Sequence, residues 1–216
     1  MDQAENTNTV AAEVAAGLLN AGAIRLQPKN PFTWSSGWKS PIYCDNRISL
    51  SFPELRTFIK VKLSELIRAH FPDAEAIAGV ATAGIPQGAL IADYLDLPFL
   101  YVRSKPKGHG MTNQIEGKAT PGQRVVVVED LISTGGSSLK AVEALRSADV
   151  SIEGLVAIFT YGFDLSIENF EQAKVPFYCL SDYPHLLEEA LKRGIIKEDE
   201  VDVLAAWRKD PANWQG

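Results

Sequence analysis

Cysteine, histidine and methionine are all scarce in this sequence. Its 216 residues include 2 cysteines, 3 histidines and 2 methionines. Cys44 and Cys179 have no partner at metal-ligand spacing, and the histidines are scattered along the chain. We therefore expect two buried free thiols and no dedicated metal site built from these side chains.

Basic residues are not in excess either. Lysine and arginine number 21 against 27 aspartates and glutamates, which gives a formal net charge of −6. General binding to nucleic acid or to a membrane surface favours a basic face, so we expect neither kind of partner. This balance still leaves room for a local basic pocket that binds a small anion.

Long apolar runs are missing as well. Runs such as Val125–Val128 are far too short to cross a bilayer. The segment Met1–Thr9 is polar and carries acids, without the basic start and apolar core of a signal peptide. We therefore expect a cytoplasmic protein.

What the sequence does contain is a regular alternation of short apolar strands and helices. Near-continuous Val and Ile runs indicate strands buried on both faces, which is typical of a parallel sheet. The pattern predicts an α/β fold in which helices cover both faces of a central parallel sheet. The expected strands are Ala76–Val80, Phe99–Arg103, Arg124–Val128 and Glu153–Phe159, and the expected helices are Pro53–His70, Ile85–Leu95 and Ser137–Ala148.

The two ends of the chain have a different character. We expect a helix at Val10–Leu19, short strands and turns over Phe32–Asn46, and a tail with a strand at Phe177–Leu180 and two polar helices. The length suits a single domain over residues 1–216. Within it we expect a core at about 52–165 and a small hood from about 10–51 and 166–216.

The strongest motif follows the most apolar strand. Two adjacent acids, Glu129 and Asp130, come directly after Val125–Val128, and the small residues Ser133–Ser137 then precede a helix. Small residues let backbone N–H groups approach an anion, and a helix N-terminus adds partial positive charge. The segment therefore predicts a phosphate site. Because the two carboxylates cannot face that phosphate, we expect them to face neutral hydroxyls such as those of a ribose.

Other interpretations of this motif have less support. A Walker loop needs a lysine beside its Ser or Thr, whereas Gly136 is followed by Ser137 and Ser138. A dinucleotide fold would need a G-x-G-x-x-G sequence that opens a helix, and this chain has none. The simplest alternative without a ligand is a buried strand followed by a helix with an ordinary Ser or Thr N-cap.

The segment Glu129–Ser137 resembles the phosphoribosyl-diphosphate binding motif of the type I phosphoribosyltransferases. In that family the paired acids hold the ribose 2′- and 3′-hydroxyls, and the following loop holds the 5′-phosphate. The resemblance identifies the donor and says little about the acceptor base. It implies catalytic roles for Glu129 and Asp130, and donor binding by these two together with Leu131, Ile132, Ser133, Thr134, Gly135, Gly136 and Ser137.

A second motif is the long polar stretch Ser104–Thr120. Positive charge gathers at its start, in Arg103, Lys105, Lys107 and His109. A loop of this length without its own structure is usually functional. A closing basic loop would neutralise a departing diphosphate and exclude water from a reactive ribosyl cation. The alternative is a solvated basic loop.

This polar loop, together with Phe32–Pro41 and Thr82–Pro86, resembles the orotate phosphoribosyltransferase family, and the similarity covers about residues 11–161. The resemblance implies that Arg103, Lys107 and His109 bind the diphosphate of the donor, with Lys107 and His109 taking part in catalysis. It also implies a homodimer with shared active sites, in which the loop enters the neighbouring subunit. Ser133 falls on the position that contacts orotate.

The chain departs from that family's pattern in several places. Many members have lysine where Ser35, Ala83 and Ser104 stand here, and arginine in the loop that reads Thr160–Gly162 in this chain. The carboxylate of orotate therefore needs another cation.

Three basic residues are candidates for replacing the missing charges. We expect Lys39 and Arg47 to face the carboxylate of orotate, although each could equally be a surface charge. Lys105 is expected to stand in for the missing loop lysine and so to help bind the donor.

Taken together, the resemblance implies a pentosyltransferase of de novo pyrimidine (UMP) synthesis. Such an enzyme transfers the phosphoribosyl group from 5-phosphoribosyl 1-diphosphate to orotate and releases orotidine 5′-phosphate and diphosphate. We expect Mg²⁺ as cofactor, held mainly by substrate oxygens rather than directly by the protein. Two alternatives share the donor motif, a purine phosphoribosyltransferase and a regulator of the same fold that senses phosphoribosyl diphosphate. The regulator is disfavoured because the acidic chain offers no added nucleic-acid-binding domain.

Overall fold

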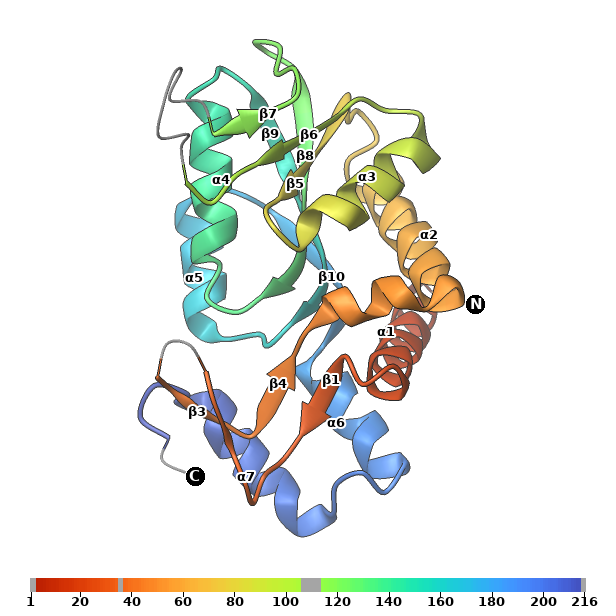
Figure 1. The fold of residues 1–216 in the computed structure, drawn as a ribbon, viewed down its shortest axis with the longest axis vertical. Coiled ribbons are helices and arrows are strands. Elements are labelled where there is room, and N and C mark those ends of the chain that lie inside the picture. Colours follow the sequence, from red (N-terminus) through yellow and green to blue (C-terminus); the bar gives the residue numbers. More distant parts are fainter. Residues whose placement is uncertain (1–2, 35–36, 106–113, 215–216) are drawn as a thin grey trace. The chain divides into compact units, whose positions relative to one another are not determined.

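Residues 3–34, 37–105 and 114–214 are described by a computed structural model of the chain (Figure 1). Two units can be distinguished by their internal contacts. The first combines residues 1–55 with 181–216, and the second contains residues 56–180. Each unit is described separately below.

The second unit is built on a mostly parallel sheet of six strands. The central strands β9, β8, β5 and β6 run parallel, and β7 pairs antiparallel with β6 at one edge. The predicted α/β fold with a central parallel sheet is therefore confirmed. In the order β10-β9-β8-β5-β6-β7, the strands are Phe177–Asp182, Ser151–Thr160, Arg124–Ile132, Ala76–Val80, Phe99–Val102 and Ile115–Glu116.

Helices cover both faces of this sheet, as the buried strands require (Figure 1). On one face, Val125 and Val127 of β8 belong to a buried cluster with Leu145 of α4 (Gly136–Arg146) and Phe170 of α5 (Asp164–Gln172). On the other face, α3 (Gly84–Leu95) comes so close that a Cβ on Gly88 would lie 3.3 Å from the Cα of Gly79 in β5. The helix α2 (Pro53–His70) precedes β5 in the chain.

The first unit joins the two ends of the chain. Its helices α1 (Gln3–Asn20) and α6 (Tyr183–Lys192) pack together, and the hydroxyl of Ser181 donates to the carbonyl oxygen of Ala11 at 2.8 Å. Two small antiparallel sheets complete it with a 3-10 helix and a last α-helix. These elements are β1 (Ile24–Leu26) with β4 (Ile42–Cys44), β2 (Phe32–Thr33) with β3 (Lys39–Ser40), η1 (Asn46–Ser51) and α7 (Glu198–Lys209).

Three local differences from the predicted elements are informative. The strand β8 continues to Ile132 instead of ending at Val128, because its neighbour β9 goes on pairing with it as far as Thr160. The short strand β7 interrupts the expected loop because it completes the sheet edge beside β6. The helix α5 was not expected, since its nine residues include only one large buried side chain, Phe170.

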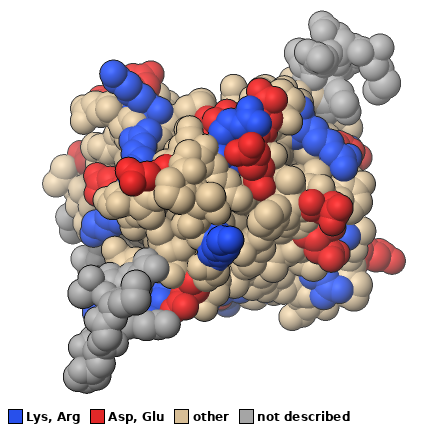
Figure 2. All heavy atoms as spheres, turned by 90° about the horizontal axis from the view of Figure 1, so that it is seen from above, with Lys and Arg blue, Asp and Glu red and all other residues tan. Residues whose placement is uncertain are grey.

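Two further expectations concern the surface and the thiols. Within the described residues neither cysteine forms a disulfide, but each is partly exposed, so the prediction that they are buried was wrong. Within the described part of the chain, no helix is long and apolar enough to cross a membrane. Figure 2 shows lysine and arginine side chains interspersed with aspartate and glutamate on the face in view.

Candidate active site

The strand β8 extends beyond its neighbour β5, and this difference in length creates a recess. The pairing of β5 with β8 ends at Gly79 opposite Val128, whereas the pairing of β9 with β8 continues to Ile132. Among the described residues, the last ones of β8 therefore have a partner strand on one side only. The recess is a cavity of about 340 Å³ lined by Ala81, Thr82, Ala83, Glu129, Asp130, Leu131, Ser133, Thr134, Gly135, Gly136 and Ser137.

The two adjacent acids of β8 have different surroundings. Successive side chains of a strand point to opposite faces, and Glu129 has the parity of Val125 and Val127, which face α4. Its carboxylate accepts hydrogen bonds from the hydroxyl of Ser138 in α4, at 3.3 Å, and from the backbone N–H of Asp130, at 3.0 Å. Glu129 is 5% exposed, whereas Asp130 is only partly buried.

The electrostatics of the pair follow from this burial. Burial first, and then the neighbouring negative charge of Asp130, raise the pKa of Glu129 well above its usual value. The hydrogen bonds that its carboxylate accepts oppose that rise, the one from Ser138 included. A ligand that donates further hydroxyl hydrogen bonds to Glu129 would also stabilise its charged form.

The turn between β8 and α4 has the geometry of an anion site. Gly135 is the N-cap residue of α4, with a left-handed φ of 81°, and a Cβ there would lie 2.6 Å from the ring of Phe170. Because glycine brings no side chain to this end, the alternative of an ordinary Ser or Thr N-cap does not describe it. The first N–H groups of a helix have no partner within the helix, so they are available for a phosphate at this end.

The base of the polar loop lies beside this turn. The backbone N–H of Arg103 donates to the carbonyl oxygen of Gln114 at 2.8 Å, and the guanidinium of Arg103 is 3.5 Å from the carboxylate of Glu116. Arg103 also lines a second cavity, of about 510 Å³, together with Gln114 and Lys140. Ala81 and Ser137 line both cavities, so the structure brings Arg103 into the same region as the predicted phosphate turn.

Four other predicted donor-binding residues are less clearly placed. Lys105 is exposed just after β6, and Lys107 and His109 lie outside the described residues. The side chain of Ile132 is fully buried, and its carbonyl oxygen accepts the N–H of Tyr161 at 3.1 Å. The roles of these residues in donor binding stay predictions.

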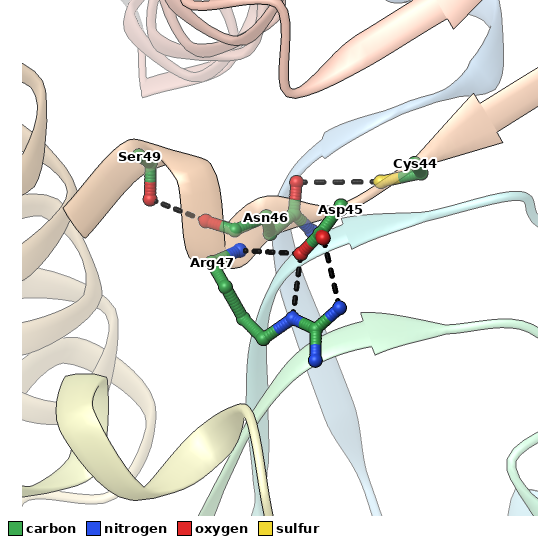
Figure 3. Close-up of polar contacts among 5 residues, drawn as sticks. All are labelled: Cys44, Asp45, Asn46, Arg47 and Ser49. Atoms are coloured by element: carbon green, nitrogen blue, oxygen red, sulfur yellow. Dashed lines mark hydrogen bonds and ion pairs between the residues drawn. The ribbon is translucent and has the colours of Figure 1, made fainter. Parts of the chain in front are cut away.

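The two candidate cations for orotate belong to the first unit. Lys39 donates to the hydroxyl of Thr33 at 3.0 Å. The guanidinium of Arg47 forms two hydrogen bonds with the carboxylate of Asp45, at 2.6 and 2.8 Å, and these hold the pKa of Asp45 below its usual value (Figure 3). Lys39 therefore contacts a neutral group, whereas the charge of Arg47 is already balanced.

Some residues around the site were not among those predicted. The loop that begins near Ala81 was expected to lie at the carboxyl edge of the sheet, where ligands of such folds bind, but no residue of the turn Ala81–Ala83 was assigned a role. Ser138 and Lys140 gave no signal in the sequence, since their positions depend on which face of α4 meets β8.

Comparisons with known proteins agree with this geometry. Residues 55–166 match the family model of the phosphoribosyl transferase domain. The chain is 58% identical over 203 residues to the orotate phosphoribosyltransferase of Cytophaga hutchinsonii, covering 94% of this chain and 97% of the relative. It is 59% identical over 201 residues to that of Phocaeicola vulgatus, covering 93% and 95%.

A solved structure gives the same result. The crystal structure of orotate phosphoribosyltransferase from Aeropyrum pernix superposes with a TM-score of 0.74 at 32% identity, covering 85% of this chain and 99% of that one. Sequence and fold therefore agree over almost the whole length, and the chain belongs to the orotate phosphoribosyltransferase family.

Proposed function

We propose that this chain transfers the phosphoribosyl group of 5-phosphoribosyl 1-diphosphate to orotate, as a step of de novo pyrimidine synthesis. The observation that carries the donor is the cavity at the end of β8, where an acid pair meets a glycine-capped helix N-terminus. The acceptor is supported by 58% identity over 94% of the chain to an orotate phosphoribosyltransferase.

The phosphate turn would hold the 5′-phosphate of the donor. The turn Ser133–Ser137 offers backbone N–H groups and hydroxyls at the N-terminus of α4, where partial positive charge favours an anion. With the phosphate in this turn, the ribose would lie along the end of β8. Asp130 and Glu129 would then accept hydrogen bonds from its 2′- and 3′-hydroxyls, which keeps the ring in one orientation.

The reaction would be a displacement at the anomeric carbon of the ribose. A ring nitrogen of orotate forms the new bond to this carbon and releases its proton to solvent. The bond from the carbon to the diphosphate oxygen breaks, and diphosphate leaves with the electron pair. Positive charge develops on the ribose in the transition state, and the nearby carboxylates of Glu129 and Asp130 stabilise it. Arg103, with Lys105, Lys107 and His109 of the polar loop, would neutralise the departing diphosphate.

Magnesium fits this site as an ion carried by the substrate. No group of three or more His, Cys, Asp or Glu side chains that could hold a metal ion occurs among the described residues. Mg²⁺ is often bound through one or two carboxylates and substrate phosphates, and the cavity has two carboxylates beside its phosphate turn. When bound, the ion would neutralise charge on the diphosphate.

We also propose that the two units form one phosphoribosyltransferase domain and that the chain acts in the cytoplasm as a homodimer with shared sites. If the polar loop serves the neighbouring subunit, two inactive variants should complement each other. Mixing Asp130→Asn with His109→Ala under conditions of subunit exchange should restore about a quarter of wild-type activity. About half of the dimers are then heterodimers, and one of the two sites in each heterodimer is intact. No recovery, despite exchange shown by mass spectrometry, would contradict shared sites.

The acceptor is tested by a panel of bases. With 5-phosphoribosyl 1-diphosphate and Mg²⁺, the purified chain should consume orotate and should leave adenine and xanthine unchanged. The consumption of orotate is measured as a decrease in its absorbance. A chain that binds the donor but uses a purine instead of orotate would contradict the proposed acceptor. Donor binding without turnover of any base would favour the sensing alternative.

A further inference from the structure

The helix α5 lies behind the predicted phosphate turn and contacts it at two consecutive residues. The side-chain amide of Asn169 donates to the carbonyl oxygen of Thr134 at 2.9 Å. The next residue, Phe170, packs against Gly135 so closely that a Cβ on the glycine would lie 2.6 Å from its ring. One helix, 35 residues further along the chain, therefore fixes both the direction and the position of the turn.

The hydrogen bond of Asn169 determines where the next N–H points. In a trans peptide the C=O and the N–H of one peptide unit point in opposite directions. The carbonyl of Thr134 is directed to Asn169, so the N–H of Gly135 on the same peptide is directed away from α5. Both Thr134 and Gly135 line the cavity at the end of β8.

We propose that Asn169 is a positioning residue that fixes the Gly135 N–H as a donor to the 5′-phosphate of the substrate. Without this anchor the peptide between Thr134 and Gly135 can rotate. Its carbonyl oxygen would then face the anion in part of the population. Preorganised donors bind an anion more strongly than donors that must first be oriented, so Asn169 sets the affinity for the phosphate end of the donor. This inference rests on the proposed function only for the identity of that donor.

The test uses two changes at Asn169 and a matched control on the same helix. Asn169→Asp keeps the shape of the side chain but replaces the amide donor with an oxygen beside the Thr134 carbonyl. Asn169→Ala removes the side chain beyond Cβ. The exposed neighbour Glu168, changed to Gln, alters α5 without touching the turn.

Calorimetric titration with ribose 5-phosphate and with 5-phosphoribosyl 1-diphosphate measures the effect. Asn169→Asp should weaken the binding of both by about tenfold, Asn169→Ala by about three- to tenfold, and Glu168→Gln by less than about twofold. Ribose 5-phosphate lacks the diphosphate, so an equal loss for both ligands assigns the effect to the phosphate turn. In turnover, KM for the donor should rise while kcat at saturating donor stays within about twofold of wild type.

Affinities within about twofold of wild type in both folded Asn169 variants would overturn the inference. So would a loss confined to 5-phosphoribosyl 1-diphosphate, because that would place the effect at the diphosphate. The titrations contain no orotate, so they decide the inference even if the chain failed to use orotate as acceptor. A wild-type chain that binds neither ligand would overturn the inference and the proposed donor together.

Discussion

The hydroxyl of Ser138 lies 3.3 Å from the carboxylate of Glu129 and links the N-terminus of α4 to the end of β8. Ser138 is itself 1% exposed, so this hydrogen bond is shielded from water. The bond stabilises the charged form of a carboxylate that burial would otherwise keep protonated. In the proposed reaction this charge would strengthen the hydrogen bonds that Glu129 accepts from the ribose and would stabilise positive charge on it.

Ser138→Ala should therefore move the acid limb of the pH profile. Loss of the donated hydrogen bond raises the pKa of Glu129 further, so kcat/KM for the donor should begin to fall at a higher pH, by about half a unit to one unit. The matched control is Ser64→Ala, because Ser64 is also a buried helical serine but donates to the backbone oxygen of Lys60. Superimposable pH profiles for wild type and Ser138→Ala would show that Ser138 does not act through Glu129.

Glu129→Gln should stabilise the fold while it impairs the reaction. The folded carboxyl binds its proton more tightly than the unfolded one, so the folded state loses stability as pH rises from about 4.3 through the raised pKa of Glu129. Glu129→Gln has no carboxyl at this position and so does not lose this stability. At about pH 8 its free energy of unfolding should exceed that of wild type by about 1 kcal/mol, which corresponds to a Tm roughly 2–4 °C higher. The difference should vanish at about pH 4. An unchanged or lower Tm of Glu129→Gln at the higher pH would contradict a pKa of Glu129 that burial raises.

Gly84 is predicted to be the glycine of α3 that tolerates substitution least. A Cβ at Gly84 would overlap the carbonyl oxygen of Val128 in β8, whereas a Cβ at Gly88 would mainly meet the ring of Phe99. Gly84→Ala should therefore push α3 away from β8 and cost about 1–3 kcal/mol, with a weaker effect for Gly88→Ala because a ring can shift. Thermal unfolding of both variants checks the order, and a reversed order would contradict this packing.

Lys39 should matter more for orotate than Arg47. Lys39 donates a hydrogen bond to the neutral hydroxyl of Thr33, whereas Asp45 already balances the charge of Arg47. Lys39→Met should raise KM for orotate by about tenfold with little change in KM for the donor, and Arg47→Met should raise it less. If neither variant changes KM for orotate, both residues are surface charges and the carboxylate has another partner.

The fold was largely predictable because its signals are local. Val125–Val128 is apolar and β-branched, and the helix Pro53–His70 has proline at its start and a periodic apolar stripe, so both segments were placed correctly. The extension of β8 to Ile132 was not predictable, because it depends on pairing with β9 rather than on local composition.

The candidate site was predictable where its motif is continuous in sequence. Glu129–Ser137 is one uninterrupted segment, and the structure places all of its residues except Ile132 around one cavity. Asn169 and Ser138 could not be predicted, because each acts through a tertiary hydrogen bond to a residue on another element. Such contacts become visible only when the packing of α4 and α5 on the sheet is known.

The most direct test of the central claim is the turnover of orotate by Asp130→Asn, measured beside wild type with 5-phosphoribosyl 1-diphosphate and Mg²⁺. Asn keeps the size of the side chain and removes the charge that would stabilise the developing positive ribose. We predict that the wild-type chain forms orotidine 5′-phosphate and diphosphate, and that kcat/KM falls by about a hundredfold or more in a variant that remains folded. Turnover within about threefold of wild type in Asp130→Asn would contradict the assignment of the active site to the end of β8.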